Sequence, residues 1–303
     1  MTANVAETMQ SVLVFDGKKD QVILTQPLKG IKDAISIEFW ANGASNLNAK
    51  TSILFGGNGD SRIVHIHFPW GNKIHWDAGD TIKHDRINKD IKSAEYKNTW
   101  NHWAFTKDAK TGVMSIYRNG TVWHTGKGKK RSLADMQTFI IGSFVSDRYY
   151  WAGALAEFRI WNIALGQNQV QTNMNQRLTG KESGLLVYLP LNEGQGIVAE
   201  DKSGTGKKNN GNIAGASWSQ MSIPIELEAT KTETSKTSKS KSNQVTKEMA
   251  KQKKAKEAKE AKEAEKKYIP ATGLEDYGRW KATLKDYKRD PKEKPFRRGR
   301  IWS

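Results

Sequence analysis

The sequence lacks cysteine altogether, although the chain is 303 residues long. Disulfide scaffolds, thiol nucleophiles and cysteine-ligated zinc are therefore excluded. Long apolar runs are also missing, because none approaches the roughly 20 residues that a membrane-spanning helix needs. The start, MTANVAETMQSVLVF, has no cationic region followed by an apolar core, so no secretory signal is visible. These absences predict a cytoplasmic protein without a transmembrane segment.

Acidic residues are in deficit, and the deficit is uneven along the chain. There are 49 Lys+Arg against 32 Asp+Glu, for a net charge of +17. Up to Trp218 the balance is 26 against 19, or +7, and after it 23 against 13, or +10. Nine of the eleven tryptophans lie in the first part. We therefore predict a packed domain followed by a basic extension that would attract an acidic protein assembly or an anionic surface.

The extension divides into three predicted segments. Residues 219–246 are rich in Ser, Thr and Lys and have too little apolar surface to offset chain entropy, which indicates a disordered linker. Residues 247–267 contain three KEA triplets without an apolar stripe and predict a charged single helix acting as a spacer. Residues 268–303 interleave basic and aromatic side chains, which is typical of a peptide that docks onto a partner. The residues expected to dock are Trp280, Tyr287, Arg289, Phe296, Arg297, Arg298, Arg300 and Trp302. Nucleic acid stays open as a partner for this tail but is not favoured.

The part before Trp218 consists of short apolar-alternating runs separated by turn signals. Asn119-Gly120 and Gly71-Asn72 are typical two-residue hairpin turns, because such pairs adopt positive φ easily. One helix is expected at Gly166–Leu178, where apolar residues recur at fourfold spacing. Many short strands with almost no helix predict an all-β sandwich or barrel over residues 11–218, after a short arm at residues 1–10. The predicted strands are two runs between Ser11 and about Val22, then Ala34–Trp40, Ser52–Phe55, Ile63–Phe68, Lys73–Trp76, Trp103–Thr106, Met114–Arg118, Thr121–Trp123, Phe139–Gly142, Ala154–Trp161 and Leu185–Leu191.

Five segments, in order, carry a family resemblance over Val12–Trp218. They are LVFDGKKDQVIL, ISIEFWANG, WNHWAFTKDAKTGVMSIYRNGTVW, FIIGSFVSDRYYWAGALAEFRIWNIALGQNQV and LLVYLPLNEGQGIVAEDKSG. Together they resemble the laminin-G-like, pentraxin-like jelly roll of the concanavalin A-like lectin and glucanase superfamily. The resemblance implies a two-sheet antiparallel jelly-roll sandwich that binds sugars, glycoconjugates or proteins, often with calcium.

One branch of that superfamily, the retaining glucanases, is catalytic through a Glu-x-Asp-x-x-Glu strand. Alternate residues of a strand project to one face, which places the two carboxylates about 5–5.5 Å apart. This sequence has no such strand, and the nearest one, AEFRIW, offers only Glu157. We therefore expect no enzymatic activity.

The sequence contains two candidate metal sites, one for calcium and one for zinc. The resemblance points to Asp16, Asp20 and Glu157 as calcium ligands. The alternative is that Asp16 caps its own turn and that Glu157 pairs with Arg159 or with a neighbouring amide. The histidines of IVHIHF and of the following strand could bind zinc. However, a two-residue turn at Gly71-Asn72 would place His67 opposite Trp76 and His75 on the other face. This pairing predicts that the imidazoles do not converge.

Surplus aromatic residues indicate the ligand site. Sugars stack their apolar C–H faces on aromatic rings, and Asp, Asn or Arg take their hydroxyl groups. The segment SDRYYWAG is therefore expected to be a binding loop. The alternative is that Tyr150 and Trp151 pack inward and the other residues only cover the rim. The predicted ligand residues are Trp70, Trp76, Trp123, Asp147, Arg148, Tyr149, Tyr150 and Trp151.

The leading hypothesis is a non-catalytic, lectin-like binder of a carbohydrate or protein ligand, tethered by its basic tail to an acidic partner. The alternative is an intracellular structural or linker protein whose jelly roll binds only protein. A divergent glycosidase is the weaker alternative.

Overall fold

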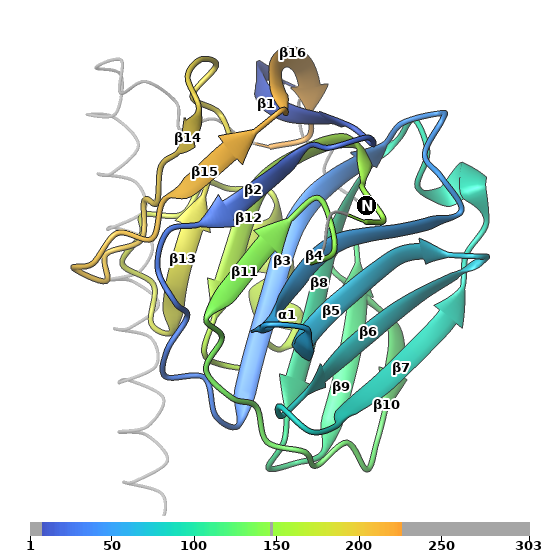
Figure 1. Cartoon of the computed structure of the whole chain (residues 1–303), viewed down its shortest axis with the longest axis vertical. Coiled ribbons are helices and arrows are strands. Elements are labelled where there is room, and N and C mark those ends of the chain that lie inside the picture. Colours follow the sequence, from blue (N-terminus) through green and yellow to red (C-terminus); the bar gives the residue numbers. More distant parts are fainter. Residues whose placement is uncertain (1–7, 146–147, 226–303) are drawn as a thin grey trace, which may run out of the picture. The chain divides into compact units, whose positions relative to one another are not determined.

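The computed structural model describes residues 8–145 and 148–225, which form two antiparallel sheets (Figure 1). Sheet A has the order β10-β9-β8-β3-β12-β1-β16, with β13 paired to β12, and sheet B has the order β14-β15-β2-β11-β4-β5-β6-β7. The strands of sheet A are β1 (Thr8–Asp16), β3 (Ala34–Gly43), β8 (Trp100–Asp108), β9 (Val113–Arg118), β10 (Thr121–Gly126), β12 (Ala152–Trp161), β13 (Leu185–Leu189) and β16 (Ser217–Ile223). Those of sheet B are β2 (Gln21–Leu24), β4 (Lys50–Asn58), β5 (Ser61–Trp70), β6 (Lys73–Gly79), β7 (His84–Asp90), β11 (Thr138–Ile141), β14 (Val198–Ala199) and β15 (Gly211–Ala214). The predicted two-sheet sandwich is confirmed.

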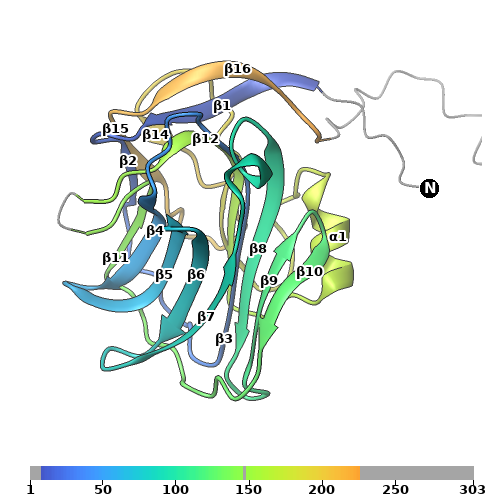
Figure 2. The same ribbon diagram turned by 90° about the vertical axis from the view of Figure 1, so that its right-hand side faces the viewer.

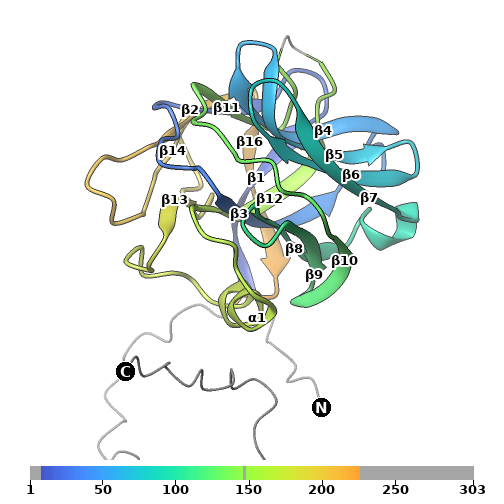
Figure 3. The ribbon, with the colours of Figure 1, turned by 90° about the horizontal axis from the view of Figure 1, so that it is seen from below.

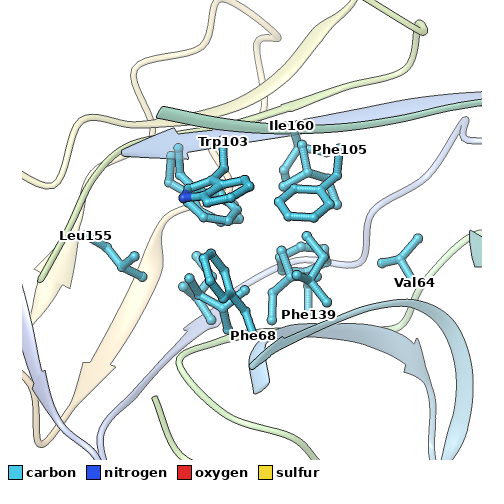
Figure 4. Close-up of a cluster of buried hydrophobic side chains, with 14 of the residues drawn as sticks. Val64, Phe68, Trp103, Phe105, Phe139, Leu155 and Ile160 are labelled. Carbon is cyan, nitrogen blue, oxygen red and sulfur yellow. The ribbon is translucent and has the colours of Figure 1, made fainter. Parts of the chain in front are cut away.

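The two sheets pack face to face around one aromatic and aliphatic core, as Figure 2 shows for the two layers. Alternation along each strand selects the core side chains, because successive residues point to opposite faces of a sheet. Figure 4 shows Trp103 and Phe105 of β8 lying against Phe68 and Phe139 of sheet B. The rings of Phe68 and Trp103 meet edge to face, with their centroids 4.9 Å apart. Edge-to-face geometry is one of the two favoured arrangements of aromatic pairs.

The outer face of sheet A is covered by the helix α1 (Gln167–Met174), which lies outside the two layers (Figure 3). Its Val170 is fully buried in a second apolar cluster with Trp161, Leu165 and Tyr188. The Nε1 of Trp40 also donates to the Met174 carbonyl at 2.7 Å. The predicted helix at Gly166–Leu178 is therefore present and shorter at its C-terminal end. In the described part of the chain, no helix has the length and apolarity needed to cross a bilayer.

Both predicted hairpin turns occur. Asn119 and Gly120 connect β9 to β10 with φ of 49° and 75°, and Gly71 connects β5 to β6 with φ of 65°. Every predicted run overlaps an observed strand, although Phe139–Gly142 and Leu185–Leu191 extend one and two residues beyond β11 and β13. The sequence did not indicate β7, β14, β15 and β16. The predicted linker at 219–246 begins too early, because residues 219–223 belong to β16, which pairs with β1. The rest of that segment from residue 226, the predicted helix at 247–267 and the predicted tail at 268–303 lie outside the described residues. The eight tail residues expected to dock lie there too.

Candidate functional site

A row of histidines lies on the outer face of sheet B. In β5, Val64, Ile66 and Phe68 point into the core, so His65 and His67 point outward. A register shift between His67 and Trp70 pairs His67 with His75, and Ile66 with Trp76. The pairing predicted from a simple two-residue turn is therefore wrong, because the β-bulge moves the register by one residue and reverses which side chains share a face. The imidazoles do converge.

Asp77 is the charge centre beneath these histidines. Its carboxylate has no exposed surface. It accepts hydrogen bonds from Arg86 Nε at 2.5 Å, Arg86 Nη2 at 2.7 Å and Arg62 Nη1 at 2.7 Å. Burial alone would raise the pKa of Asp77, but the hydrogen bonds from Arg86 and the contact with His67 hold that pKa far below its ordinary value. Asp77 is therefore a charged carboxylate fixed between two guanidiniums.

The histidines are held in their neutral form. Burial lowers the pKa of His65 well below 6.5, and the neighbouring His67 lowers it further. Burial also lowers the pKa of His67, against the opposing effect of Asp77, whose Oδ2 lies 3.5 Å from His67 Nε2. The pKa of His75 falls to about 4, because of burial and the charge of Arg86. The imidazole rings that face outward here are therefore neutral at neutral pH, and each can donate one hydrogen bond and accept one.

Aromatic rings and cations form the rim above the histidines. The rings of Trp70 and Tyr149 meet at 70° with their centroids 4.8 Å apart, and both side chains are half-buried. The Arg148 guanidinium lies 5.7 Å from the ring centre of Phe144 and 5.8 Å from that of Tyr149. Together these groups enclose about 330 Å³, which we call the histidine cleft; its lining residues are Arg62, His65, His67, Trp70, His75, Arg86, Phe144, Arg148 and Tyr149.

The segment that carries Phe144, Arg148 and Tyr149 is fixed by backbone hydrogen bonds. Trp151 N donates to Gly142 O at 2.7 Å, and Phe144 N donates to Arg148 O at 2.9 Å. Ser52 N on β4 donates to Tyr149 O at 2.7 Å, and Tyr149 has φ of 58°. A bulky residue rarely adopts that conformation, and such residues cluster at ligand sites. The backbone bond to β4 therefore holds the Tyr149 ring at the cleft.

The structure separates the predicted ligand residues into groups. Trp70, Arg148 and Tyr149 line the histidine cleft. Trp76 and Trp151 are fully buried in the core, so their prediction as ligand residues is corrected: alternation along β6 and the return of the loop into the sandwich turn both rings inward. Trp123 lies on β10, in the other sheet, with Lys89 Nζ 4.7 Å from its ring centre.

Two predicted ligand residues remain. Tyr150 is half-buried and does not line the cleft, and Asp147 lies outside the described residues. The sequence reading missed Arg62, Arg86 and Phe144 as cleft residues. Alternation along β5 did not indicate Arg62, because it would place Arg62 on the core side with Val64 and Ile66; a register shift between the pairs Gly56–Val64 and Gly57–Arg62 changes its face. β7, which carries Arg86, has no strand signal of its own.

The predicted calcium ligands are not brought together. Asp16 Oδ1 accepts from Lys18 N at 2.8 Å, and Asp20 Oδ2 accepts from Asp16 N at 2.6 Å, so both carboxylates serve their own turn. Glu157 lies five residues beyond Ala152, the partner of Asp16 in the ladder, which is roughly 16 Å along the strand. Its Oε2 accepts from Arg159 Nη2 and from the Tyr188 hydroxyl. These three residues do not fit a calcium ion.

The histidine cleft holds the one cluster of metal-type donors found among the described residues. Donor atoms of His65, His67 and Asp77 lie within 4.8 Å of one another. Three nitrogen–oxygen hydrogen bonds from two guanidiniums already occupy the Asp77 carboxylate, however. A divalent cation would have to share that carboxylate with Arg62 and Arg86, whose charges repel it. The donor set therefore fits a zinc ion poorly.

Residues 16–171 match the concanavalin A-like lectin/glucanases superfamily. The chain belongs to this superfamily. A search of curated proteins found no match.

Several solved structures are similar to part of this chain. A candidate carbohydrate-binding protein from Bacteroides ovatus has a TM-score of 0.56 and 22% identity, over 72% of this chain and 62% of that one. The chain thus spans less than two thirds of that protein's length. A heptameric SAP-like pentraxin from Limulus polyphemus has a TM-score of 0.42 and 18% identity, over 54% of this chain and 81% of that one. The binding domain of botulinum neurotoxin serotype G has a TM-score of 0.42 and 16% identity, over 56% of this chain and 46% of that one.

Proposed function

We propose that this chain is a non-catalytic carbohydrate-binding protein whose ligand binds in the histidine cleft. The observation that carries the proposal is the half-buried pair Trp70 and Tyr149 at the mouth of a cleft lined otherwise by arginines and neutral histidines. Aromatic rings offer an apolar face to the C–H groups of a sugar. The guanidinium and imidazole N–H groups offer directed hydrogen bonds to its oxygens. A volume of about 330 Å³ is at the lower end of the range of small-ligand pockets.

The arrangement of carboxylates supports a binding role without catalysis. Glycoside hydrolysis ordinarily needs two carboxyl groups that flank the scissile bond. Glu38 and Glu157 are both buried on the face of sheet A that α1 covers, and both pair with Arg159, at 3.3 and 2.8 Å. At the cleft, Asp77 is held by Arg62 and Arg86. None of these three carboxylates is placed to donate a proton to a bound sugar or to attack it.

The test compares glycan binding by the full chain and two tryptophan variants. We expect the wild-type protein to retain members of a glycan array and Trp70→Ala to lose at least about tenfold in affinity, because truncating a buried aromatic anchor typically costs 2 kcal/mol or more. Trp123→Ala is the matched control, since Trp123 is also half-buried but lies outside the cleft. Circular dichroism shows whether each variant folds.

Two outcomes would overturn the proposal. One is a wild-type protein that retains no glycan. The other is a folded Trp70→Ala variant that binds glycans as well as the wild type does.

We further propose that the basic aromatic segment at residues 268–303 tethers the protein to an acidic partner. The support is the sequence: basic residues alternate with Trp280, Tyr287, Phe296 and Trp302. Aromatic side chains among basic residues suit a peptide that orders on a partner. Affinity capture by the full chain should lose a partner when Arg297, Arg298 and Arg300 become Gln. Replacing Lys251, Lys253 and Lys254 by Gln removes equal charge elsewhere, and equal losses from both variants would show that only net charge matters.

A further inference from the structure

The lining of the histidine cleft carries an excess of positive charge. Three of its nine lining residues are arginines, and none of these described residues is acidic. A fourth cation, Lys50, lies at the rim with its Nζ 5.7 Å from the ring centre of Trp70. Beneath the lining, Asp77 contributes one negative charge, and its hydrogen bonds go to Arg62 and Arg86. The cations at the cleft therefore exceed the carboxylates close to them.

Several buried nitrogen atoms at this cleft have no hydrogen-bond partner within the described part of the chain. Arg62 uses Nη1 for Asp77, and its buried Nε has no partner there. Nδ1 of His65, of His67 and of His75 is likewise buried and unpartnered among those residues. His65 is 1% exposed and His67 is 6% exposed, yet both line the cleft. Buried polar atoms without partners are rare in folded proteins and mark places where a ligand, water or ion is expected.

The cations are also arranged around aromatic rings. The guanidiniums of Arg62 and Arg148 lie 6.0 and 5.7 Å from the ring centre of Phe144. Arg148 lies next to Tyr149, whose ring meets Trp70. A ring-shaped ligand with an anionic substituent would find an aromatic face and a planar N–H fork side by side.

The three classes of ligand fare differently in this cleft. A divalent cation meets several positive charges and a carboxylate that is already occupied. A neutral sugar satisfies the imidazoles but displaces water from guanidiniums without supplying a counter-charge, which is costly. An anionic group on a sugar ring supplies that counter-charge and accepts from the unpartnered Nε–H of Arg62.

We propose that the histidine cleft selects an acidic sugar, meaning a sugar ring that carries a carboxylate or a sulfate group. The anionic group lies against Arg148 and Arg62, and the sugar ring lies against Trp70 and Tyr149. This inference rests on the proposed carbohydrate-binding function and names the substrate class of the same site.

The experiment uses matched oligosaccharide triplets: a neutral oligosaccharide, its C6-oxidised uronate form and its 6-O-sulfated form. Binding to the full chain is measured by calorimetry at about 0.15 M salt, where interactions between exposed charges are screened beyond roughly 8 Å. We expect at least one charged member of a triplet to bind about tenfold or more tightly than its neutral parent. Comparing the uronate with the sulfated form shows which anionic group the cleft prefers.

Variants separate the cleft from the rest of this basic chain. Arg148→Gln, an exposed residue of the rim, should lower affinity for the charged member by about tenfold and leave the neutral member nearly unchanged. Arg131→Gln is the matched control, because its side chain is 41% exposed, makes only long ion pairs of 3.8 and 3.9 Å, and does not line the cleft. It removes the same charge and should leave both affinities unchanged.

The possible results are distinguishable. Neutral parents that bind as tightly as their charged forms would overturn this inference and leave the carbohydrate-binding function standing. Equal losses in Arg148→Gln and Arg131→Gln would overturn it too, because binding would then follow net charge alone. Binding that requires added Zn²⁺ or disappears in EDTA would assign the cleft to a metal instead. A protein that binds no member of any triplet would contradict both proposals.

Discussion

Arg159 shows how one residue can hold a sheet and a helix together. It is fully buried, and its guanidinium donates to Glu38 at 3.3 Å and to Glu157 at 2.8 Å. It also donates to the carbonyls of Asn173 and Gln176, at 2.8 and 2.7 Å, at the C-terminal end of α1. Burial alone would lower its pKa, but the two carboxylates hold the pKa of Arg159 above its ordinary value. A cation also interacts favourably with the C-terminal end of a helix.

Removing the Arg159 charge should strongly destabilise the fold. Arg159→Met leaves Glu38 buried without a charged partner and leaves Glu157 with only its 3.8 Å ion pair to Arg177, and burial already raises the pKa of Glu38. We expect the free energy of unfolding to fall by about 3–5 kcal/mol, measured by urea denaturation. Arg131→Met, at the surface, should change it by no more than about 0.5 kcal/mol. A small effect at Arg159 would mean that the packing of α1, rather than this ion cluster, stabilises the outer face of sheet A.

Buried histidines predict a loss of stability in mild acid. Burial holds the pKa of His65 and of His102 well below 6.5, so both are neutral in the folded protein at neutral pH. Below pH 6.5 the unfolded chain binds protons at these residues and the native protein does not. These two histidines therefore do not lower the free energy of unfolding above pH 6.5. This free energy should fall by about 1.4 kcal/mol per pH unit for each histidine as the pH decreases toward the native pKa.

Thermal unfolding between pH 7.5 and 5.0 measures this dependence. The midpoint should decrease steadily below pH 6.5, and His65→Gln should flatten the slope. A midpoint that stays constant or rises over that range would contradict the burial of these imidazoles.

Single residues also show where sequence reasoning ends. The aromatic surplus indicated a sugar site, and Trp70 and Tyr149 do line the cleft. Residue type alone could not show that Trp76 differs from Trp70 and Tyr149, because the face of the sheet to which Trp76 points depends on the strand register. That register depends on the bulge between His67 and Trp70. Pro69 lies within it, and a proline inside a strand is typical of a bulge, but it does not specify by how many residues the pairing shifts.

At the scale of elements, apolar alternation predicted the strands that face the core. β7, HDRINKD, was missed because its only buried residue is Ile87. Such an edge strand has one neighbour and is placed by pairing with β6 rather than by its own apolar pattern. The cleft could not be predicted for the same reason, because it depends on strand pairing. Arg86 on β7 and Arg62 on β5 come together only because both donate to Asp77 on β6, the strand between them.

The β9–β10 turn should depend on glycine for two separate reasons. Gly120 has φ of 75°, and an added Cβ would lie 2.8 Å from Gln171 Cγ and 3.0 Å from Met174 Sδ of α1. Gly59 also has a positive φ, of 55°, with nothing within 4 Å of an added Cβ. Gly59→Ala should therefore cost about 1–2 kcal/mol from backbone strain alone, and Gly120→Ala should cost more. Equal costs in urea denaturation would show that the Gln171 and Met174 side chains move aside at little cost.

At the scale of the whole molecule, the chain divides into two units, Met1–Thr230 and Lys231–Ser303. Both sheets, α1 and the cleft are formed by residues of the first unit. We therefore expect a chain that ends at Thr230 to fold. Its far-ultraviolet circular dichroism per strand residue should equal that of the full chain, and calorimetry should show one cooperative unfolding transition. Its affinity for the preferred glycan should match that of the full chain at about 0.15 M salt. An aggregated or unfolded product would show that residues after Thr230 are needed for folding.

The segment between Gly142 and Trp151 has a consequence for engineering. Its ends are joined by the Trp151–Gly142 hydrogen bond, and Trp151 itself is fully buried. Everything that the segment contributes to the cleft lies between those two fixed points. Loops of this kind tolerate changes of length and sequence because few core contacts depend on them. Randomising residues 144–149 within an unchanged sandwich would therefore give a library of binding proteins. New ligand preferences could be selected from it while the core and both sheets stay the same.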